Sequence, residues 1–187
     1  MMKQLLKSVR CILFFSALAV CATGCGSDAF SAWETDFDIA KENAQSANKN
    51  ILVFFSTDDA QGVSDDLKKN VFAKKKFVSA VSPDFTLLNI AVTESEYTES
   101  QNNTAEKSAF QKKLDILDTY SVETMPALYM LTKEGFVIKA FNYDPAVNSV
   151  AHYVELLGGE KENAASYNSL VRAVEESQGV YRVRAIN

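Results

Sequence analysis

Short apolar runs that alternate with helical patterns constrain the fold of this chain more than any other feature of its sequence. The run at 51–55, ILVFF, is rich in strand-forming residues and short enough to be a buried central strand. Residues 85–92 and 127–131 have the same character, and 136–141 follow the latter across a tight turn at 133–135. We therefore expect four main strands, the last two of which form an antiparallel hairpin.

Segments with helical periodicity separate and flank these strands. We expect helices over 34–47, from Val63 to the lysine run at 74–76, over 106–120 and over 163–177. Thr35 or Asp36 can cap the first helix, and the lysine run marks the solvated end of the second. Residues 93–105 are polar and have no hydrophobic period, so we expect a loop there. Alternation followed by a hairpin predicts an α/β fold, with a mixed sheet and helices on both faces.

All three cysteines lie near the beginning of the sequence, at positions 11, 21 and 25. The rest of the chain can therefore form no internal disulfide and no thiolate metal site, and it has no cysteine nucleophile. The single histidine, His152, excludes a His-rich zinc cluster, and no triad is evident around it. A net charge of −5 gives no basic footprint for nucleic acid. We expect no catalytic residue, no metal and no cofactor.

The first 25 residues have the composition of a secretory targeting segment. Residues 1–10 carry three basic residues and no acidic one. Residues 11–22 are an apolar run of twelve, which is shorter than the ~20 residues of a transmembrane helix. Small residues then lead to Cys25, and this sequence resembles a bacterial lipobox, in which the cysteine is lipidated and becomes the mature N-terminus. The alternative is a plain signal peptide cut near Cys25, which leaves a free thiol.

These features predict an exported protein, attached to the bacterial cell membrane by a lipid on Cys25 and facing the periplasm or the cell surface. The predicted organisation is a signal peptide at 1–24, a tether at 25–32, a folded domain at 33–177 and a C-terminal tail at 178–187.

The order of elements, with a proline just before the third strand, resembles the thioredoxin fold. The resemblance covers 33–177 and is closest to a thioredoxin-like group with an N-terminal Trp-x-x-Asp-Phe stretch, which here begins at Trp33. The cis-proline motif of the family corresponds to Thr124-Met125-Pro126-Ala127. Its Cys-x-x-Cys motif corresponds to Gln61-Gly62-Val63-Ser64.

The resemblance places Gln61 and Ser64 where the family performs its chemistry. In a Cys-x-x-Cys motif, the helix N-terminus stabilises a thiolate that attacks a disulfide, and the second thiol resolves the mixed disulfide. Gln61 has no ionisable nucleophile, and the Ser64 hydroxyl is far too weakly acidic to replace a thiolate. We therefore expect a redox-inactive protein. The alternative is an enzyme, related to thiol:disulfide interchange or of another envelope class.

The resemblance also implies a peptide-binding role that does not depend on cysteine. It concerns Met125, Pro126 and Ala127. In thioredoxin-like proteins, the backbone beside the cis-proline pairs with an extended peptide by strand addition. Met125 can add a soft, adaptable contact. The alternative is that Pro126 only shapes its loop. We expect a binding module that contacts an envelope protein, or an extended peptide, through the surface of Gln61 and Pro126.

Two further features have structural explanations. Asp58, Asp59, Asp65 and Asp66 surround the degenerate motif, and we expect them to cap the helix and complement its dipole, because their spacing does not fit a calcium loop. Trp33 is expected to pack under the first helix rather than to contact a ligand.

Overall fold

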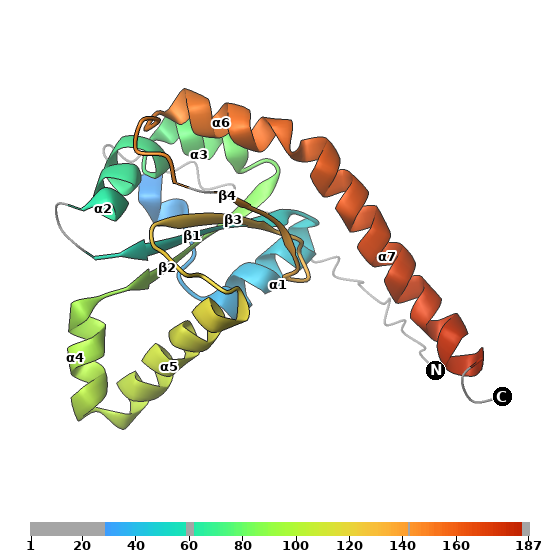
Figure 1. The fold of residues 1–187 in the computed structure, drawn as a ribbon, viewed down its shortest axis with the longest axis horizontal. Coiled ribbons are helices and arrows are strands. Elements are labelled where there is room, and N and C mark those ends of the chain that lie inside the picture. Colours follow the sequence, from blue (N-terminus) through green and yellow to red (C-terminus); the bar gives the residue numbers. More distant parts are fainter. Residues whose placement is uncertain (1–28, 59–61, 142, 185–187) are drawn as a thin grey trace, which may run out of the picture.

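The computed structural model describes residues 29–58, 62–141 and 143–184. A four-stranded sheet in the order β2–β1–β3–β4 forms its centre (Figure 1). β1 runs parallel to β2 and antiparallel to β3, and β3 forms an antiparallel hairpin with β4. The strands are β1 Asn50–Thr57, β2 Phe85–Val92, β3 Ala127–Leu131 and β4 Val137–Phe141. The expected α/β fold class and the expected hairpin are therefore confirmed.

Helices cover both faces of this sheet. α1 and α5 pack on one face, and α2, η2, α3 and α6 pack on the other (Figure 1). The helical elements are η1 Ala29–Ala32, α1 Phe37–Ala47, α2 Val63–Leu67, η2 Lys68–Phe72, α3 Lys75–Val81, α4 Glu94–Asn102, α5 Thr104–Thr119, α6 Val150–Gly159 and α7 Lys161–Arg184.

The core on the α2 side is aromatic and is organised around Trp33. The Trp33 ring stacks on Phe77 with ring centroids 6.3 Å apart, and its indole N–H donates to the carbonyl oxygen of Phe72 at 3.2 Å. Phe54 of β1 lies against both Trp33 and Phe72. Trp33 is buried, as expected, but it lies on the face of the sheet opposite α1. The expectation that it packs under the first helix is wrong.

The core on the α1 side is aliphatic and allows a close approach of helix and sheet. Ala40 and Ala44 of α1 are fully buried against the side chains that β1 directs to this face. Asp36 caps α1, because its carboxylate accepts hydrogen bonds from the backbone N–H groups of Asp38 and Ile39 at 2.8 and 3.1 Å. The bond from Ile39 lowers the pKa of Asp36 below its ordinary value. The predicted first helix and its cap are confirmed.

The sequence suggested that the lysine run at 74–76 marks the end of a helix, and this expectation is wrong. α2 has five residues and continues into η2, which ends at Phe72. Lys74 is extended and precedes α3, which begins at Lys75. Phe77 and Val81, four residues apart, are both buried on the inner face of α3. Burial of these two side chains stabilises the additional helix. The exposed lysines around its start obscure their four-residue spacing in the sequence.

The expected loop at 93–105 is also wrong, because α4 occupies most of it. The Thr93 hydroxyl accepts a hydrogen bond from the Glu96 backbone N–H at 3.1 Å and caps the helix. Glu96 forms an ion pair with Lys113 of α5, and the Tyr97 ring meets Phe110 of α5 with centroids 6.0 Å apart. Helix α4 is thus held against α5 through few apolar contacts, which is why it shows no hydrophobic period.

The C-terminal part contains two helices where the sequence indicated one. α6 was missed, although its Tyr153 and Leu157 are buried in the aromatic core. α7 begins at Lys161 and runs to Arg184, beyond the predicted end at 177, and extends away from the sheet (Figure 1). Leu170 and Val174 of α7 are 65% and 54% exposed, so their apolar spacing does not mark a buried face. None of the described helices is both long and apolar enough to span a bilayer.

Candidate functional site

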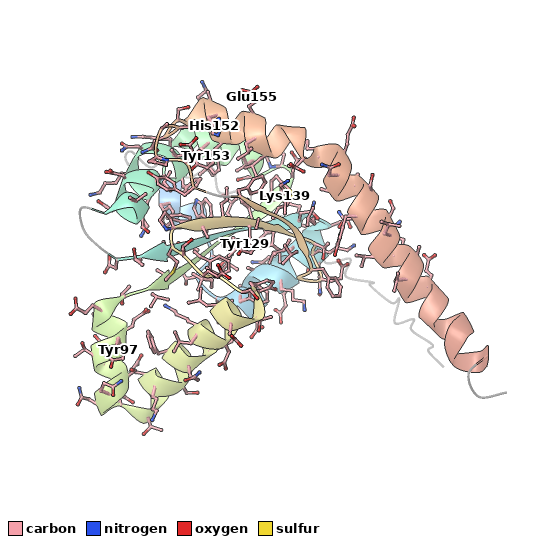
Figure 2. The ribbon with its side chains drawn as sticks, in the orientation of Figure 1. Tyr97, Tyr129, Lys139, His152, Tyr153 and Glu155 are labelled. Atoms are coloured by element: carbon pink, nitrogen blue, oxygen red, sulfur yellow. The ribbon has the colours of Figure 1, made fainter. Side chains whose placement is uncertain are left out.

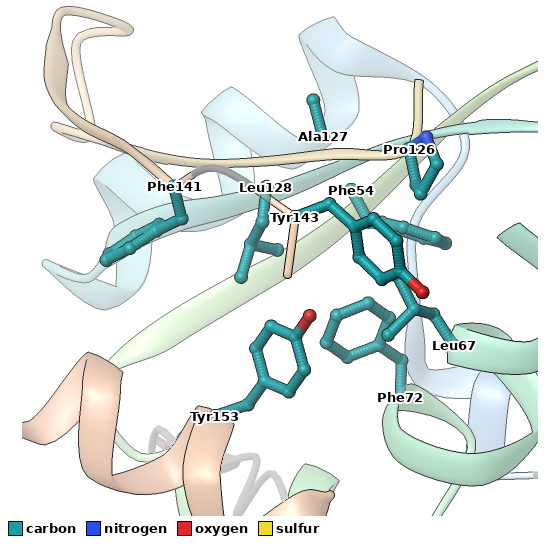
Figure 3. Close-up of a pocket in the computed structure, with 9 residues that line it drawn as sticks. All are labelled: Phe54, Leu67, Phe72, Pro126, Ala127, Leu128, Phe141, Tyr143 and Tyr153. Atoms are coloured by element: carbon teal, nitrogen blue, oxygen red, sulfur yellow. The ribbon is translucent and has the colours of Figure 1, made fainter. Parts of the chain in front are cut away.

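The beginning of α2 and the loop before β3 meet at the C-terminal end of β1. Ala127, the first residue of β3, is the pairing partner of Phe55 near that end. Leu67 of α2 and Pro126 line one small cavity of about 10 Å³, roughly the room of a single water molecule (Figure 3). The structure therefore places α2 and the proline loop side by side, whereas the predicted surface of Gln61 and Pro126 stays a prediction. Cys25 and Gln61 lie outside the described residues.

Ser64 is a structural residue in the first turn of α2. Its side chain is almost fully buried, and its hydroxyl oxygen accepts a hydrogen bond from the Thr57 backbone N–H at 3.1 Å. The hydroxyls of Thr57 and Ser64 share a second hydrogen bond, also at 3.1 Å. Among the described residues, no imidazole, carboxylate or amine is hydrogen-bonded to this hydroxyl. Ser64 thus connects α2 to β1, and none of the described residues acts as a base toward its hydroxyl.

The proline loop leaves backbone groups available next to β3. The Met125–Pro126 peptide bond is cis. Neither Thr124 nor Met125 makes a backbone hydrogen bond to any described residue. Thr124 is exposed to solvent and Met125 is partly buried against the core of the α1 side. An extended segment from another molecule can pair with such groups, because strand addition needs only unpaired main-chain donors and acceptors.

A groove of about 450 Å³ adjoins this loop, and we call it the proline groove. Tyr129 and Ala140, which face each other across the β3–β4 pair, form part of its floor, together with Phe141 and Tyr143. Tyr129 packs on the α1 side of the sheet, whereas Phe141 belongs to the aromatic core on the other side. The described residues of the lining are Ser121, Glu123, Thr124, Met125, Pro126, Ala127, Tyr129, Ala140, Phe141 and Tyr143.

The small cavity beneath Pro126 is closed by aromatic rings (Figure 3). Phe72 packs edge-on against Tyr153 with centroids 5.2 Å apart. Burial, reinforced by the nearby Tyr143 and Asp144, raises the pKa of Tyr153 to about 12. Tyr153 is therefore a neutral packing residue at physiological pH, and the cavity under Pro126 has room for no more than about one water molecule.

The charged and titratable candidates have structural roles. Asp65 forms an ion pair with Lys69 at 2.6 Å, and Asp65 and Asp66 both lie in the first turn of α2, as expected for dipole complementation. No group of three or more His, Cys, Asp or Glu residues in the described part of the chain is arranged to hold a metal. His152 lies on α6 beside Tyr153, on the opposite face of the sheet from the Tyr129 side of the groove (Figure 2).

Sequence reasoning missed the groove-lining residues of the hairpin. Tyr129 and Ala140 stand in predicted strands, and their partnership follows once the hairpin register is known. Tyr143 follows β4 in a segment with no recognisable pattern, so nothing in the sequence signalled its place.

Comparisons with known proteins agree with this architecture. A family model described as a thioredoxin-like domain matches residues 37–146. Among solved structures, the "DsbH Oxidoreductase" superposes with a TM-score of 0.54 at 16% identity, over 71% of this chain and 83% of that one. The oxidised C-terminal domain of DsbD from Neisseria meningitidis gives a TM-score of 0.46 at 13% identity, over 70% of this chain and 100% of that one. No curated protein matches by sequence.

If Ser64 is a structural tie, Ser64→Ala should lower the free energy of unfolding by ~1 kcal/mol, because the Thr57 N–H loses its acceptor. Urea unfolding followed by circular dichroism measures the change. The matched control is Ser79→Ala on the exposed face of α3, which should cause no loss. Equal stability of the two variants would contradict the structural role of Ser64.

Proposed function

This chain belongs to the thioredoxin-like family, and we propose that it is an exported, redox-inactive member that binds an extended segment of an envelope protein in the proline groove. One observation carries the proposal: Thr124 and Met125 have backbone groups without partners among the described residues, directly beside a groove large enough for side chains. Main-chain pairing supplies the affinity in this binding mode, and pockets for alternate side chains supply the selectivity.

The composition of the groove suits such a partner. Tyr129, Phe141 and Tyr143 offer aromatic surface, and Met125 offers a flexible, polarisable contact. Glu123 is the one charged residue among the described residues of the lining, which are neither strongly acidic nor basic as a set. An extended segment with apolar or aromatic side chains at alternate positions fits this surface, since such side chains point to the same side of a strand.

The absence of redox activity is proposed on chemical grounds. Thiol–disulfide exchange needs a thiolate at the helix N-terminus. Gln61 provides no thiol, and the buried Ser64 hydroxyl is occupied by Thr57. The likeness to the "DsbH Oxidoreductase" concerns the fold. A disulfide oxidoreductase function is the alternative, and no side-chain contact around Ser64 favours it.

The binding proposal predicts partner capture at one face only. A photo-crosslinking amino acid at position 125 should capture an envelope protein in the native envelope, whereas the same group at the exposed Ala151 of α6 should not. Ala140→Trp should abolish capture from position 125, because Ala140 is exposed and its enlargement fills the groove. Ala151→Trp is the matched control and should preserve capture. Identical products from both positions, or capture that survives Ala140→Trp, would refute the assignment.

Redox inactivity predicts that the purified domain does not accelerate the reduction of insulin by dithiothreitol. The double variant Gln61→Cys, Ser64→Cys should gain measurable activity, because it restores both thiols at the helix N-terminus. Turnover by the unaltered protein would overturn the proposal. A well-folded double variant that stays inert would show that 61 and 64 are not the positions of the family motif.

We further propose that acyl chains on Cys25 hold the protein at the membrane. Each buried CH₂ contributes ~0.8 kcal/mol, and stable attachment takes more than one chain. Mass spectrometry of the membrane fraction should find Cys25 diacylated or triacylated at the N-terminus of the mature chain. Cys25→Ser should release the protein from the membrane fraction, whereas Cys21→Ser should not. An unmodified Cys25 would disprove the anchor.

A further inference from the structure

A second concave site lies at the opposite end of β1 from the proline groove. It is a pocket of about 150 Å³ between the end of α1, the start of β1, the β3–β4 turn and α7, and we call it the basal pocket. β1 spans Asn50–Thr57, so ~23 Å of strand separates the basal pocket from the Ser64 end. Its lining is Asn48, Lys49, Asn50, Lys133, Glu134, Asn168, Val171 and Arg172.

The hydrogen bonds of the basal pocket leave two amide donors available, beside one amide acceptor, Asn168 Oδ1. Lys133 Nζ donates to Asn48 Oδ1 at 2.7 Å, and Asn168 Nδ2 donates to Asn50 Oδ1 at 3.0 Å. Both amide oxygens are therefore engaged by the wall of the pocket itself. The Nδ2 groups of Asn48 and Asn50 have no acceptor among the described residues, which leaves two amide donors for a ligand.

The charged side chains of the pocket also favour an anionic ligand. Among the described residues, Lys49, Lys133 and Arg172 line it with a single carboxylate, Glu134, and Lys49 Nζ donates to the Ser82 carbonyl oxygen at 2.7 Å, which leaves Lys133 and Arg172 as the cations for a ligand. The Arg172 guanidinium makes no hydrogen bond or ion pair with any described residue. This local excess of positive charge stands out in a chain whose net charge is −5. A guanidinium fork with lysine and amide donors is the set that recognises the oxygens of phosphate.

The size of the pocket limits the ligand to a small group. Pockets for drug-sized molecules measure ~300–1,000 Å³, so 150 Å³ accommodates an ion or a headgroup rather than a whole organic ligand. We propose that the basal pocket binds a phosphate group, either as the free ion or as part of a phospholipid headgroup. This proposal does not rest on peptide binding in the proline groove.

α7 completes the site. The Asn168–Asn50 hydrogen bond attaches this helix to the first residue of β1, and Arg172 follows one turn later. Both residues lie beyond 146, where the match to the family model ends. The proposed site is thus assembled from residues inside the family match and from residues of α7 beyond it.

Titration of the full chain in detergent with inorganic phosphate tests the proposal. Calorimetry should detect saturable binding, and Arg172→Gln should weaken it at least tenfold. Lys107→Gln, which removes one charge from an exposed position on α5, should leave it unchanged. Binding should also weaken as sodium chloride rises, because the interaction is ionic. Circular dichroism checks that both variants are folded.

A vesicle arm distinguishes the two sources of phosphate. The full chain is compared on phosphatidylcholine vesicles with and without phosphatidylglycerol. Tighter association with the anionic vesicles that Arg172→Gln removes would support a headgroup as the ligand, whereas phosphate binding without that preference would support the free ion. Failure of both probes, or binding that Arg172→Gln and Lys107→Gln affect equally, would overturn the proposal. Neither result alters the crosslinking test of the proline groove.

Discussion

Burial of β1 on both faces is the constraint on which the rest of the structure depends. Its residues 51–56 are all buried, with alternate side chains directed into the aromatic core and the aliphatic core. The strand also pairs on both edges, so its backbone groups are satisfied within the sheet. A strand held in this way cannot shift its register without exposing one of the two cores. The two ends of β1 are therefore held in place, and one of the two concave sites lies at each end.

The contact between Thr57 and Ser64 connects α2 to the C-terminal end of β1. Here the serine hydroxyl is buried and is hydrogen-bonded to both the backbone N–H and the hydroxyl of Thr57. The proline loop depends on none of these bonds, because Ala127 is held by its pairing with Phe55. The position of Ser64 and the position of the proline loop are thus set by separate contacts.

The sequence predicted those parts of the fold that buried apolar residues mark. All four strands and the first helix were recognised, because their inner faces are continuous or regularly spaced. α4 was missed, since Thr93 caps it and Lys113 braces it, and neither contact leaves a hydrophobic period. α3 was missed because lysines surround the two residues that bury it. Helical propensity and capping are weak local signals, and tertiary contacts decide whether such a segment becomes a helix.

The candidate sites were predictable only in part for a related reason. Met125, Pro126 and Ala127 are adjacent in sequence and carry a motif, so resemblance located them. Tyr143 and Arg172 reach their sites through the path of the chain after β4, which no local pattern specifies.

The two sites lie at opposite ends of β1. The ~23 Å length of this strand exceeds the ~8 Å Debye length at physiological ionic strength. A charge bound in the basal pocket is therefore largely screened from the proline groove. Coupling between them would have to pass through β1, whose two buried faces resist displacement. The two sites should accordingly act as independent modules on one rigid strand.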